Sequence, residues 1–170
     1  MSLRGKSVLV TGYGFVGKHL VDSLLEQGMN VTVLERDLYV LQDLDTSKVD
    51  VIQSDILYLN KQLEFDFVIH TAGITNVRYS ELNPVETYIN NVVATLNLLR
   101  HVKVAERFIF TSSATVYDNI GNVALLDESA PLNPRSIYGL SKVAAEDLIR
   151  FYQKRYQLKF TIVRLFNLYG

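Results

Sequence analysis

Tyr138 and Lys142 are the first candidates for chemistry, because they stand four residues apart in the run YGLSK. On a helix this spacing places both side chains on one face. A phenol has an ordinary pKa of about 10, and a neighbouring ammonium group stabilises the phenolate and lowers that pKa. Such a tyrosine could take the proton of a substrate hydroxyl as a general base. The chain has ten tyrosines, so a pair at this spacing also arises readily by chance.

Ser113 supports the pair by its place in the chain. It comes just after the apolar run Arg107–Thr111, which is typical of a strand. In open parallel sheets, ligands bind outside the carboxyl ends of the strands. The Ser113 hydroxyl could therefore hold the reacting oxygen of a substrate beside Tyr138. A serine at a strand end is more often a simple cap, so its significance depends on Tyr138 and Lys142. The three residues form the candidate catalytic group.

A second chemical signal is the pattern G-x-G-x-x-G formed by Gly12, Gly14 and Gly17. Gly12 permits a tight turn, Gly14 lets backbone amides approach a pyrophosphate, and Gly17 lets a helix and a strand pack closely. Phe15 and Val16 would then open a helix whose free N–H groups face the phosphates. Alone, the motif could be an ordinary strand-to-helix turn, but its position between an apolar run and an amphipathic run favours dinucleotide binding.

An acidic residue, Glu35, ends the next apolar run and could bind both hydroxyls of an adenosine ribose. A 2′-phosphate would be repelled there, so NAD is expected rather than NADP. Arg36 stands beside Glu35 and could offset part of that repulsion. An oxidised nicotinamide ring would also place positive charge near Tyr138 and accept a hydride there.

These side chains need a scaffold, and short β-branched runs alternate with longer amphipathic runs along the chain. We expect a Rossmann-type α/β fold: a doubly wound parallel sheet with helices on both faces, in one domain covering residues 1–170. The predicted strands are Ser7–Thr11, Asn30–Glu35, Val49–Gln53, Asp66–His70, Arg107–Thr111 and Lys159–Leu165.

Three helices have legible ends. The first is predicted over Phe15–Gln27, with Gly28 as the left-handed residue that stops it. The second begins after an Asn83 cap, with proline at its first position, and continues to Leu99. The third covers about residues 137–156. Its predicted buried stripe consists of Val143, Ala144, Leu148 and Phe151.

Composition excludes several functions. Basic and acidic residues nearly balance, at 17 and 18, which does not indicate binding to nucleic acid or to an anionic membrane. The absence of cysteine excludes disulfides and thiolate sites. The three histidines lack the i, i+4 spacing of metal ligands, so no metal is expected. No apolar run suits a membrane span and no signal peptide opens the sequence, so a cytoplasmic location is expected.

Some strand-end residues have more than one interpretation. His70 is expected to be structural rather than catalytic. Tyr117 could line a substrate pocket or cover the sheet edge. Arg78 and Arg164 could each meet a phosphate or serve as an ordinary surface or strand-end charge.

With these motifs in place, the chain resembles the extended short-chain dehydrogenase/reductase family over essentially its whole length. It is most similar to nucleotide-sugar epimerases and dehydratases of the UDP-glucose 4-epimerase type. The resemblance rests on several runs in order: TGYGFVG, SDI, VIHTAG, NNVVAT, SSATVY, YGLSK and RLFNLYG.

The resemblance implies roles for matching positions. Ser113, Tyr138 and Lys142 match the family's catalytic triad, with Tyr138 and Lys142 also touching the cofactor and Ser113 the substrate. The other implied cofactor contacts are Asp55 and Ile56 at the adenine, Ala72 and Gly73 along the cofactor, and Asn91 behind the active site. Asn167 matches a residue that meets the sugar nucleotide's diphosphate.

Several departures from the family pattern matter. The glycine loop is one residue shorter than usual, which could shift the pyrophosphate, and Ala94 replaces a common glycine. Ala114 and Thr115 stand where 4,6-dehydratases carry Asp-Glu, which disfavours a dehydratase. Family members are roughly twice as long, so we expect a truncated chain without the C-terminal substrate domain.

The resulting hypothesis is an NAD-dependent epimerase of a nucleotide-diphosphate sugar, acting by hydride transfer through a transient keto intermediate. The alternatives are an NAD(P)-dependent reductase or dehydrogenase of the same family, and a non-catalytic dinucleotide-binding fragment or sensor. The resemblance also implies a homodimer through the helices that follow Asn83 and Ile137.

Overall fold

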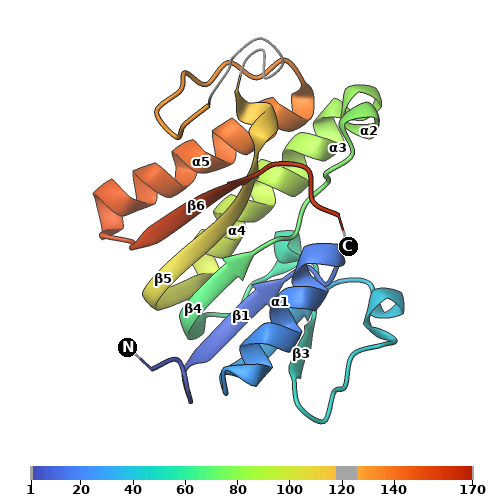
Figure 1. Ribbon diagram of the computed structural model, residues 1–170, viewed down its shortest axis with the longest axis vertical. Helices are drawn as coiled ribbons and strands as arrows, with labels where there is room; N and C mark the ends of the chain where they lie inside the picture. Colours follow the sequence, from blue (N-terminus) through green and yellow to red (C-terminus); the bar gives the residue numbers. More distant parts are fainter. Residues whose placement is uncertain (1, 118–125, 170) are drawn as a thin grey trace.

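The computed structural model describes residues 2–117 and 126–169. These residues form a six-stranded parallel sheet in the order β3-β2-β1-β4-β5-β6, as expected (Figure 1). The strands are β1 (Ser7–Thr11), β2 (Asn30–Glu35), β3 (Asp50–Gln53), β4 (Leu63–His70), β5 (Val102–Ser113) and β6 (Phe160–Leu165). β4 and β5 are longer than predicted, because their first residues pair with each other from Leu63 and Val102 onward. The strand order reverses between β1 and β4, where dinucleotide-binding sheets hold their ligands.

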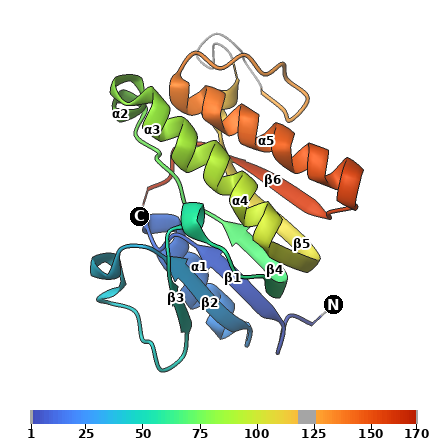
Figure 2. The same cartoon turned by 180° about the vertical axis from the view of Figure 1, so that it is seen from behind.

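Helices lie on both faces of this sheet. α1 (Phe15–Glu26) covers one face, and α4 (Ala94–His101) and α5 (Ile137–Tyr156) lie side by side on the other, as Figures 1 and 2 show from opposite sides. Successive side chains of β1 point to opposite faces of the sheet and so contribute to the hydrophobic core on each face. Val8 and Val10 pack with Val21 of α1, whereas Leu9 packs in the cluster that contains residues of α4 and α5. The doubly wound α/β architecture predicted from the sequence is therefore confirmed.

The predicted second helix is interrupted. Where one helix was expected, α3 (Pro84–Tyr88) is followed by η3, a π-helical turn over Ile89–Val93, and then by α4. Asn83 is the N-cap and Pro84 begins α3, as expected, but the Asn83 side chain makes no capping hydrogen bond. The Asn83 side chain donates to Tyr79 O at 3.2 Å, because an unpredicted helix, α2 (Val77–Leu82), ends immediately before it. Single-turn π segments occur frequently at functional sites.

The predicted buried stripe of α5 was wrong as well. Phe151 is 56% exposed, and Val143, Ala144 and Leu148 are partly buried. The residues that α5 buries include polar ones: Tyr138, Gly139, Ser141, Lys142, Ala145, Glu146 and Ile149. The helix turns a largely polar face toward the end of β5, where hydrogen bonds and ion pairs take the place of apolar packing.

Three 3₁₀ turns complete the description: η1 (Leu38–Leu41) after β2, η2 (Ile56–Tyr58) after β3, and η4 (Ala114–Val116) after β5. The first helix ends as predicted, with Gly28 at φ 72°. Within the described ranges, no helix is long and apolar enough to cross a membrane.

Candidate active site

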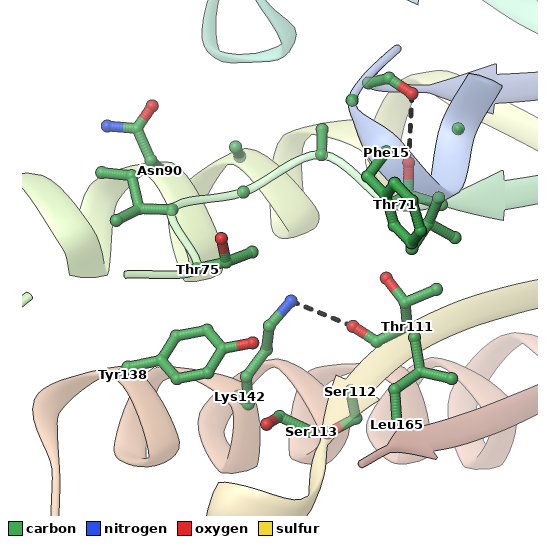
Figure 3. Close-up of a pocket in the computed structure, with 18 of the residues that line it drawn as sticks. Phe15, Thr71, Thr75, Asn90, Thr111, Ser112, Ser113, Tyr138, Lys142 and Leu165 are labelled. Carbon is green, nitrogen blue, oxygen red and sulfur yellow. Dashed lines mark hydrogen bonds between the residues drawn. The ribbon is translucent and has the colours of Figure 1, made fainter. Parts of the chain in front are cut away.

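A pocket of about 1030 Å³ opens at the carboxyl ends of the strands. Nearly every residue singled out from the sequence lines it. The lining includes Gly12, Gly14, Phe15, Val16, Gly17, Glu35, Arg36, Asp55, Ile56, Ala72, Gly73, Ser113, Tyr138, Lys142 and Asn167. Figure 3 shows Phe15 and Thr71 on the wall opposite Tyr138, Lys142 and Ser113. The position agrees with the crevice expected at the switch between β1 and β4.

The glycine loop has the geometry that a pyrophosphate needs. A Cβ on Gly12, whose φ is +83°, would lie 2.8 Å from Ala72 Cα, and a Cβ on Gly17 would collide with Gly12 O. A Cβ on Gly14 would meet nothing within 4 Å, so Gly14 borders open space at the start of α1. Gly14 is the N-cap and contributes no side-chain hydrogen bond. The first amides of α1 therefore face a space that suits a dinucleotide diphosphate.

Glu35 is fixed by backbone amides rather than by side chains. Its Oε2 accepts from Tyr13 N at 3.0 Å, and its Oε1 accepts from the amides of Arg36 and Asp37 at 2.8 and 3.1 Å. The glutamate thereby ties the shortened glycine loop to the end of β2. It still lines the pocket, and its carboxylate oxygens have further lone pairs that could accept ribose hydroxyls.

Arg36 is not free to meet a 2′-phosphate, because its guanidinium is already paired. Its Nη1 donates to Asp55 Oδ2 and to Asn90 Oδ1, both at 3.1 Å. Arg36 thus connects the end of β2 with Asp55, two residues after β3, and with the π-helical turn. Asp55 also caps η2 by accepting from Leu57 N at 2.9 Å.

The candidate catalytic group is assembled between α5 and the end of β5. Ser136 caps α5 by accepting from Gly139 N at 3.0 Å, which places Tyr138 in the first turn. Ser113 Oγ accepts from Thr115 N at 3.2 Å and from Thr115 Oγ1 at 3.0 Å. Its own hydroxyl proton is therefore left for another acceptor, and the Ser113 hydroxyl acts to lower the pKa of Tyr138. The sequence argument had placed Ser113 and Tyr138 together, and both side chains line the same pocket.

Lys142 does not lower the pKa of Tyr138 below its ordinary value, as had been expected. Burial raises the pKa of Tyr138 above its ordinary value, and the nearby Ser113 hydroxyl opposes that rise only in part. The reason is geometric. Lys142 Nζ donates to Thr111 O at 3.0 Å, lies 4.7 Å from the centre of the Phe110 ring and is 5.9 Å from that of Tyr138.

Lys142 itself is buried, with 3% of its surface exposed. Burial lowers its pKa to about 8, while the nearby Glu146 carboxylate acts in the opposite direction. An ammonium group with this pKa is mostly charged at neutral pH and can lose its proton slightly above it.

Asn91 lies behind the pocket and does not line it. Its amide accepts from Ile74 N at 2.7 Å and donates to Ile74 O and to Ser141 Oγ, both at 2.9 Å. Asn91 therefore holds the backbone after Gly73 against α5. Its neighbour Asn90 lines the pocket, and the sequence analysis did not single it out.

His70 lies in the core beneath the pocket, where it connects β1 with α4. Its Nδ1 is 2.6 Å from Thr11 Oγ1, and its Nε2 is 2.9 Å from Thr95 Oγ1. The Thr95 hydroxyl donates its proton to Asn91 O at 2.7 Å, since a carbonyl can only accept. Thr95 Oγ1 can therefore only accept from His70. His70 must therefore carry its proton on Nε2 and accept from Thr11 on Nδ1. Burial lowers its pKa to about 3, so the ring is neutral.

The remaining strand-end residues are now placed. Tyr117 is buried, and its hydroxyl accepts from Arg164 Nη1 at 2.7 Å, so Tyr117 covers the sheet edge rather than the pocket. Arg164 pairs with Glu146. Several further pocket residues were missed, although each adjoins a strand end or a recognised motif: Thr71, Ile74, Thr75, Asn90, Thr111, Leu165, Phe166 and Leu168. No group of three potential metal ligands occurs in residues 2–117 and 126–169.

Comparison with known proteins agrees with this geometry. The sequence profile of the NAD dependent epimerase/dehydratase family matches residues 8–170. The chain is 34% identical over 171 residues to a putative UDP-glucose 4-epimerase of Methanocaldococcus jannaschii, covering 96% of this chain and 56% of that protein. It is 35% identical over 173 residues to UDP-glucuronic acid decarboxylase 4 of Arabidopsis thaliana, covering 96% of this chain and 39% of that protein.

The solved structures agree as well. UDP-glucuronic acid 4-epimerase from Bacillus cereus, in complex with UDP-glucuronic acid and NAD, superimposes with a TM-score of 0.85 at 29% identity. The match covers 96% of this chain and 57% of that one. The chain spans about half the length of the curated epimerases it matches, with 56% and 54% of two of them covered. With a family profile matched over nearly all of its residues, the chain belongs to the NAD-dependent epimerase/dehydratase family of enzymes.

Proposed function

We propose that this chain is the cofactor-binding and catalytic part of an NAD-dependent epimerase that acts on a nucleotide-diphosphate sugar. The observation that carries the proposal is that Ser113, Tyr138 and Lys142 share one pocket with the glycine loop. A protein that only bound a dinucleotide would have no chemical need for that group. Relatives of this chain are named as epimerases of UDP-glucose and UDP-glucuronic acid, which favours a UDP-sugar as substrate.

NAD fits the residues present. The amides at the start of α1 would hold its diphosphate, Glu35 its adenosine ribose, and Asp55 with Ile56 its adenine. Ala72, Gly73 and Lys142 would contact the nicotinamide half. The carboxylate of Glu35 lies where a 2′-phosphate would be repelled, and Arg36 is already paired with Asp55, so we expect NAD rather than NADP. When bound, NAD supplies a hydride acceptor for a sugar carbon.

The protein's own residues would handle the proton. Ser113 has one hydroxyl proton and would orient the reacting sugar oxygen beside Tyr138. Tyr138 would remove the proton from that oxygen, although burial alone keeps its pKa high. Positive charge next to the ring is therefore required, and Lys142, mostly protonated at neutral pH, would provide part of it. Return of the proton from Tyr138 would complete the cycle.

The sugar end of the pocket favours epimerisation over dehydration. Among the described residues, the carboxylates that line the pocket are Glu35 and Asp55, both at the proposed adenosine end, while Ala114 and Thr115 follow Ser113. Elimination of water needs a further acid or base beside the sugar. Asn167 lines the pocket after β6, where it could meet the substrate diphosphate.

Calorimetric titration of the chain with NAD and separately with NADP tests the cofactor assignment. We expect micromolar binding of NAD and much weaker binding of NADP; equal affinities would refute the role of Glu35. Adding UDP-glucose or UDP-glucuronic acid to the NAD-loaded protein then tests the chemistry through the nicotinamide absorbance. Reduction that depends on the sugar and disappears in Tyr138→Phe supports the proposal, and reduction unchanged in that variant refutes it. An epimerase retains its NADH, whereas a reductase or dehydrogenase releases it.

The resemblance also implies a homodimer, and exposed apolar residues of η3, α4 and α5 support this proposal. Ile89 and Val93 of η3, Leu96 of α4, and Leu140 and Phe151 of α5 are 39–56% exposed. The helices lie side by side in Figure 2. Sedimentation of the wild type and Leu96→Glu tests the proposal: we expect a dimer that the variant converts to a monomer, and a wild-type monomer would refute it.

A further inference from the structure

Glu146 is a buried ionisable residue that the proposed reaction does not use. It lies on α5 with none of its side chain exposed. Four donors meet its two oxygens. Oε1 accepts from Ser112 Oγ at 2.6 Å and from Arg164 Nε at 3.0 Å, and Oε2 accepts from Arg164 Nη2 at 2.9 Å and from Arg150 Nη2 at 2.6 Å. Burying a carboxylate carries a large desolvation penalty, which is offset only when good partners surround it.

The position of Glu146 relates it to the candidate catalytic group. Tyr138, Lys142 and Glu146 follow one another at four-residue intervals, so they lie along one face of α5. Each contacts the end of β5. Tyr138 lines the pocket together with Ser113, whose hydroxyl acts to lower the Tyr138 pKa; Lys142 donates to the carbonyl of Thr111, and Glu146 accepts from Ser112. Three successive turns of the helix are thus joined to three consecutive strand residues, and Glu146 makes the third connection.

Glu146 also shapes the charge around Lys142. The groups near Lys142 are His70 of β4, which is neutral, the Phe110 ring of β5, and Tyr138 and Glu146 of α5. Arg164 of β6 and Arg150 lie beyond Glu146 and reach its carboxylate. The Glu146 carboxylate opposes the effect of burial on the pKa of Lys142. Burial acts to raise the pKa of Glu146, but hydrogen bonds from Arg164, Ser112 and Arg150 outweigh it and hold that pKa below its ordinary value.

We propose that Glu146 is a positioning residue: it fixes α5 in register on the end of β5 and holds Lys142 as an ammonium ion beside Tyr138. Glu146 acts through Lys142 and Ser112 and touches no reacting atom. The consequence for catalysis rests on the proposed function, but the contacts and the charge effect do not. Arg164 extends the same connection, since it also donates to Tyr117 and to Glu128 O, which lie on either side of the undescribed residues 118–125.

The two arginines offer a matched control. Arg164 is 12% exposed and makes contacts on several sides, so its removal would disturb the fold. Arg150 is 34% exposed and pairs with Glu146 and Asp147, so Arg150→Met leaves the carboxylate in place and removes one cation. The effects of Glu146→Gln and Arg150→Met on Lys142 should then have opposite signs, which a general loosening of the structure would not produce.

NMR titration of the lysine side chains tests the proposal on the chain itself, with Lys142→Arg to assign the signal. We expect a Lys142 midpoint near pH 8 in the wild type. Loss of an opposite charge at this spacing should lower the midpoint by about one pH unit in Glu146→Gln. Arg150→Met should raise it by roughly a few tenths of a unit, because a like charge is removed.

An unchanged midpoint in a folded Glu146→Gln variant would overturn the proposal. If that variant does not fold, the direction in Arg150→Met decides: a rise supports the charge effect and no rise refutes it. Calorimetry with NAD is run in parallel. Failure of the wild type to bind NAD would count against the proposed function, whereas the lysine titration would still decide the role of Glu146.

Discussion

The buried His70 makes the stability of the protein depend on pH in a way that can be calculated. Its pKa is lowered from 6.5 to about 3 by burial, with a smaller contribution from Lys142. Below pH 6.5 the unfolded chain binds a proton that the folded chain does not bind, so the free energy of unfolding falls as the pH falls. At about pH 5 this loss is RT ln(1 + 10^1.5), or about 2 kcal/mol, and it continues to grow until the pH reaches the folded pKa.

His70→Gln removes the titrating ring while keeping an amide that can donate toward Thr95. The substitution also loses the packing of the imidazole against Phe108 and Phe110, whose ring centres lie 6.1 and 5.6 Å away. We therefore expect about 1–3 kcal/mol of destabilisation at neutral pH. Between about pH 7 and pH 5 the wild type should lose about 2 kcal/mol more than the variant does.

Urea unfolding at both pH values measures that difference. His19, His101 and the carboxylates are common to both proteins, so their contributions cancel in the comparison. Equal losses of stability in the two proteins would refute the reasoning. An independent check is the ¹⁵N spectrum of the imidazole, which should show the Nε2–H form and no titration above the acid unfolding transition.

Three further predictions concern the pocket. Gly14→Ala should change the melting temperature by no more than a few degrees, because its Cβ meets nothing within 4 Å, yet it should weaken NAD binding by at least ~10-fold. Gly17→Ala should instead lower the free energy of unfolding by about 1–3 kcal/mol, because its Cβ meets Gly12 O. Thermal melts and calorimetry on both variants check this, and similar melts would contradict it. Lys142→Met should stabilise the protein by up to about 3 kcal/mol at neutral pH, since burial lowers the lysine pKa from 10.5 to about 8, while impairing NAD binding. In the wild type, the cost of burying charged Lys142 should shrink as the pH rises from about 8 to 10.5, so its free energy of unfolding should rise relative to that of Lys142→Met. Urea unfolding of both proteins across that range measures this difference, and a fall instead of a rise would contradict the prediction. Glu35→Gln should narrow the preference for NAD over NADP by roughly ten-fold, since a single charge next to a phosphate is removed, and unchanged relative affinities would count against the ribose assignment.

The strands were predictable because their β-branched runs are long enough to be buried on both faces. β1, β2 and β6 agree with expectation to within a residue at each end. The glycines were predictable for a different reason: Gly12 and Gly28 have positive φ, and a Cβ on Gly17 would meet Gly12 O within the same loop, so the residue type reveals the backbone. Most of the pocket followed from these two facts, because parallel strands bring their carboxyl ends to one edge.

What the sequence did not reveal depends on side-chain hydrogen bonds between distant elements. The π-helical turn after Tyr88 accompanies contacts of Asn91 with Ile74 and Ser141, and hydrophobic periodicity carries no trace of them. The buried face of α5 was misassigned for the same reason, since apolar spacing pointed to Phe151 and the helix instead buries Lys142 and Glu146. The available signal was the four-residue spacing of Glu146 from Lys142, which places it on the same face as the recognised pair.

His70, Glu146, Lys142 and Tyr138 are buried ionisable groups behind or within the pocket, and the fold sets the protonation of each by different means. Burial keeps His70 neutral, and two arginines keep Glu146 charged. Lys142 is subject to opposing effects that leave its pKa at about 8, so its charge can change close to neutral pH. Tyr138 has a raised pKa, and the described side chains around it do not make it a phenolate. A reaction that uses Tyr138 as a base therefore needs added positive charge in the pocket. Glu146 supports the charged state of Lys142, and that state determines how much further positive charge must be added to lower the pKa of Tyr138.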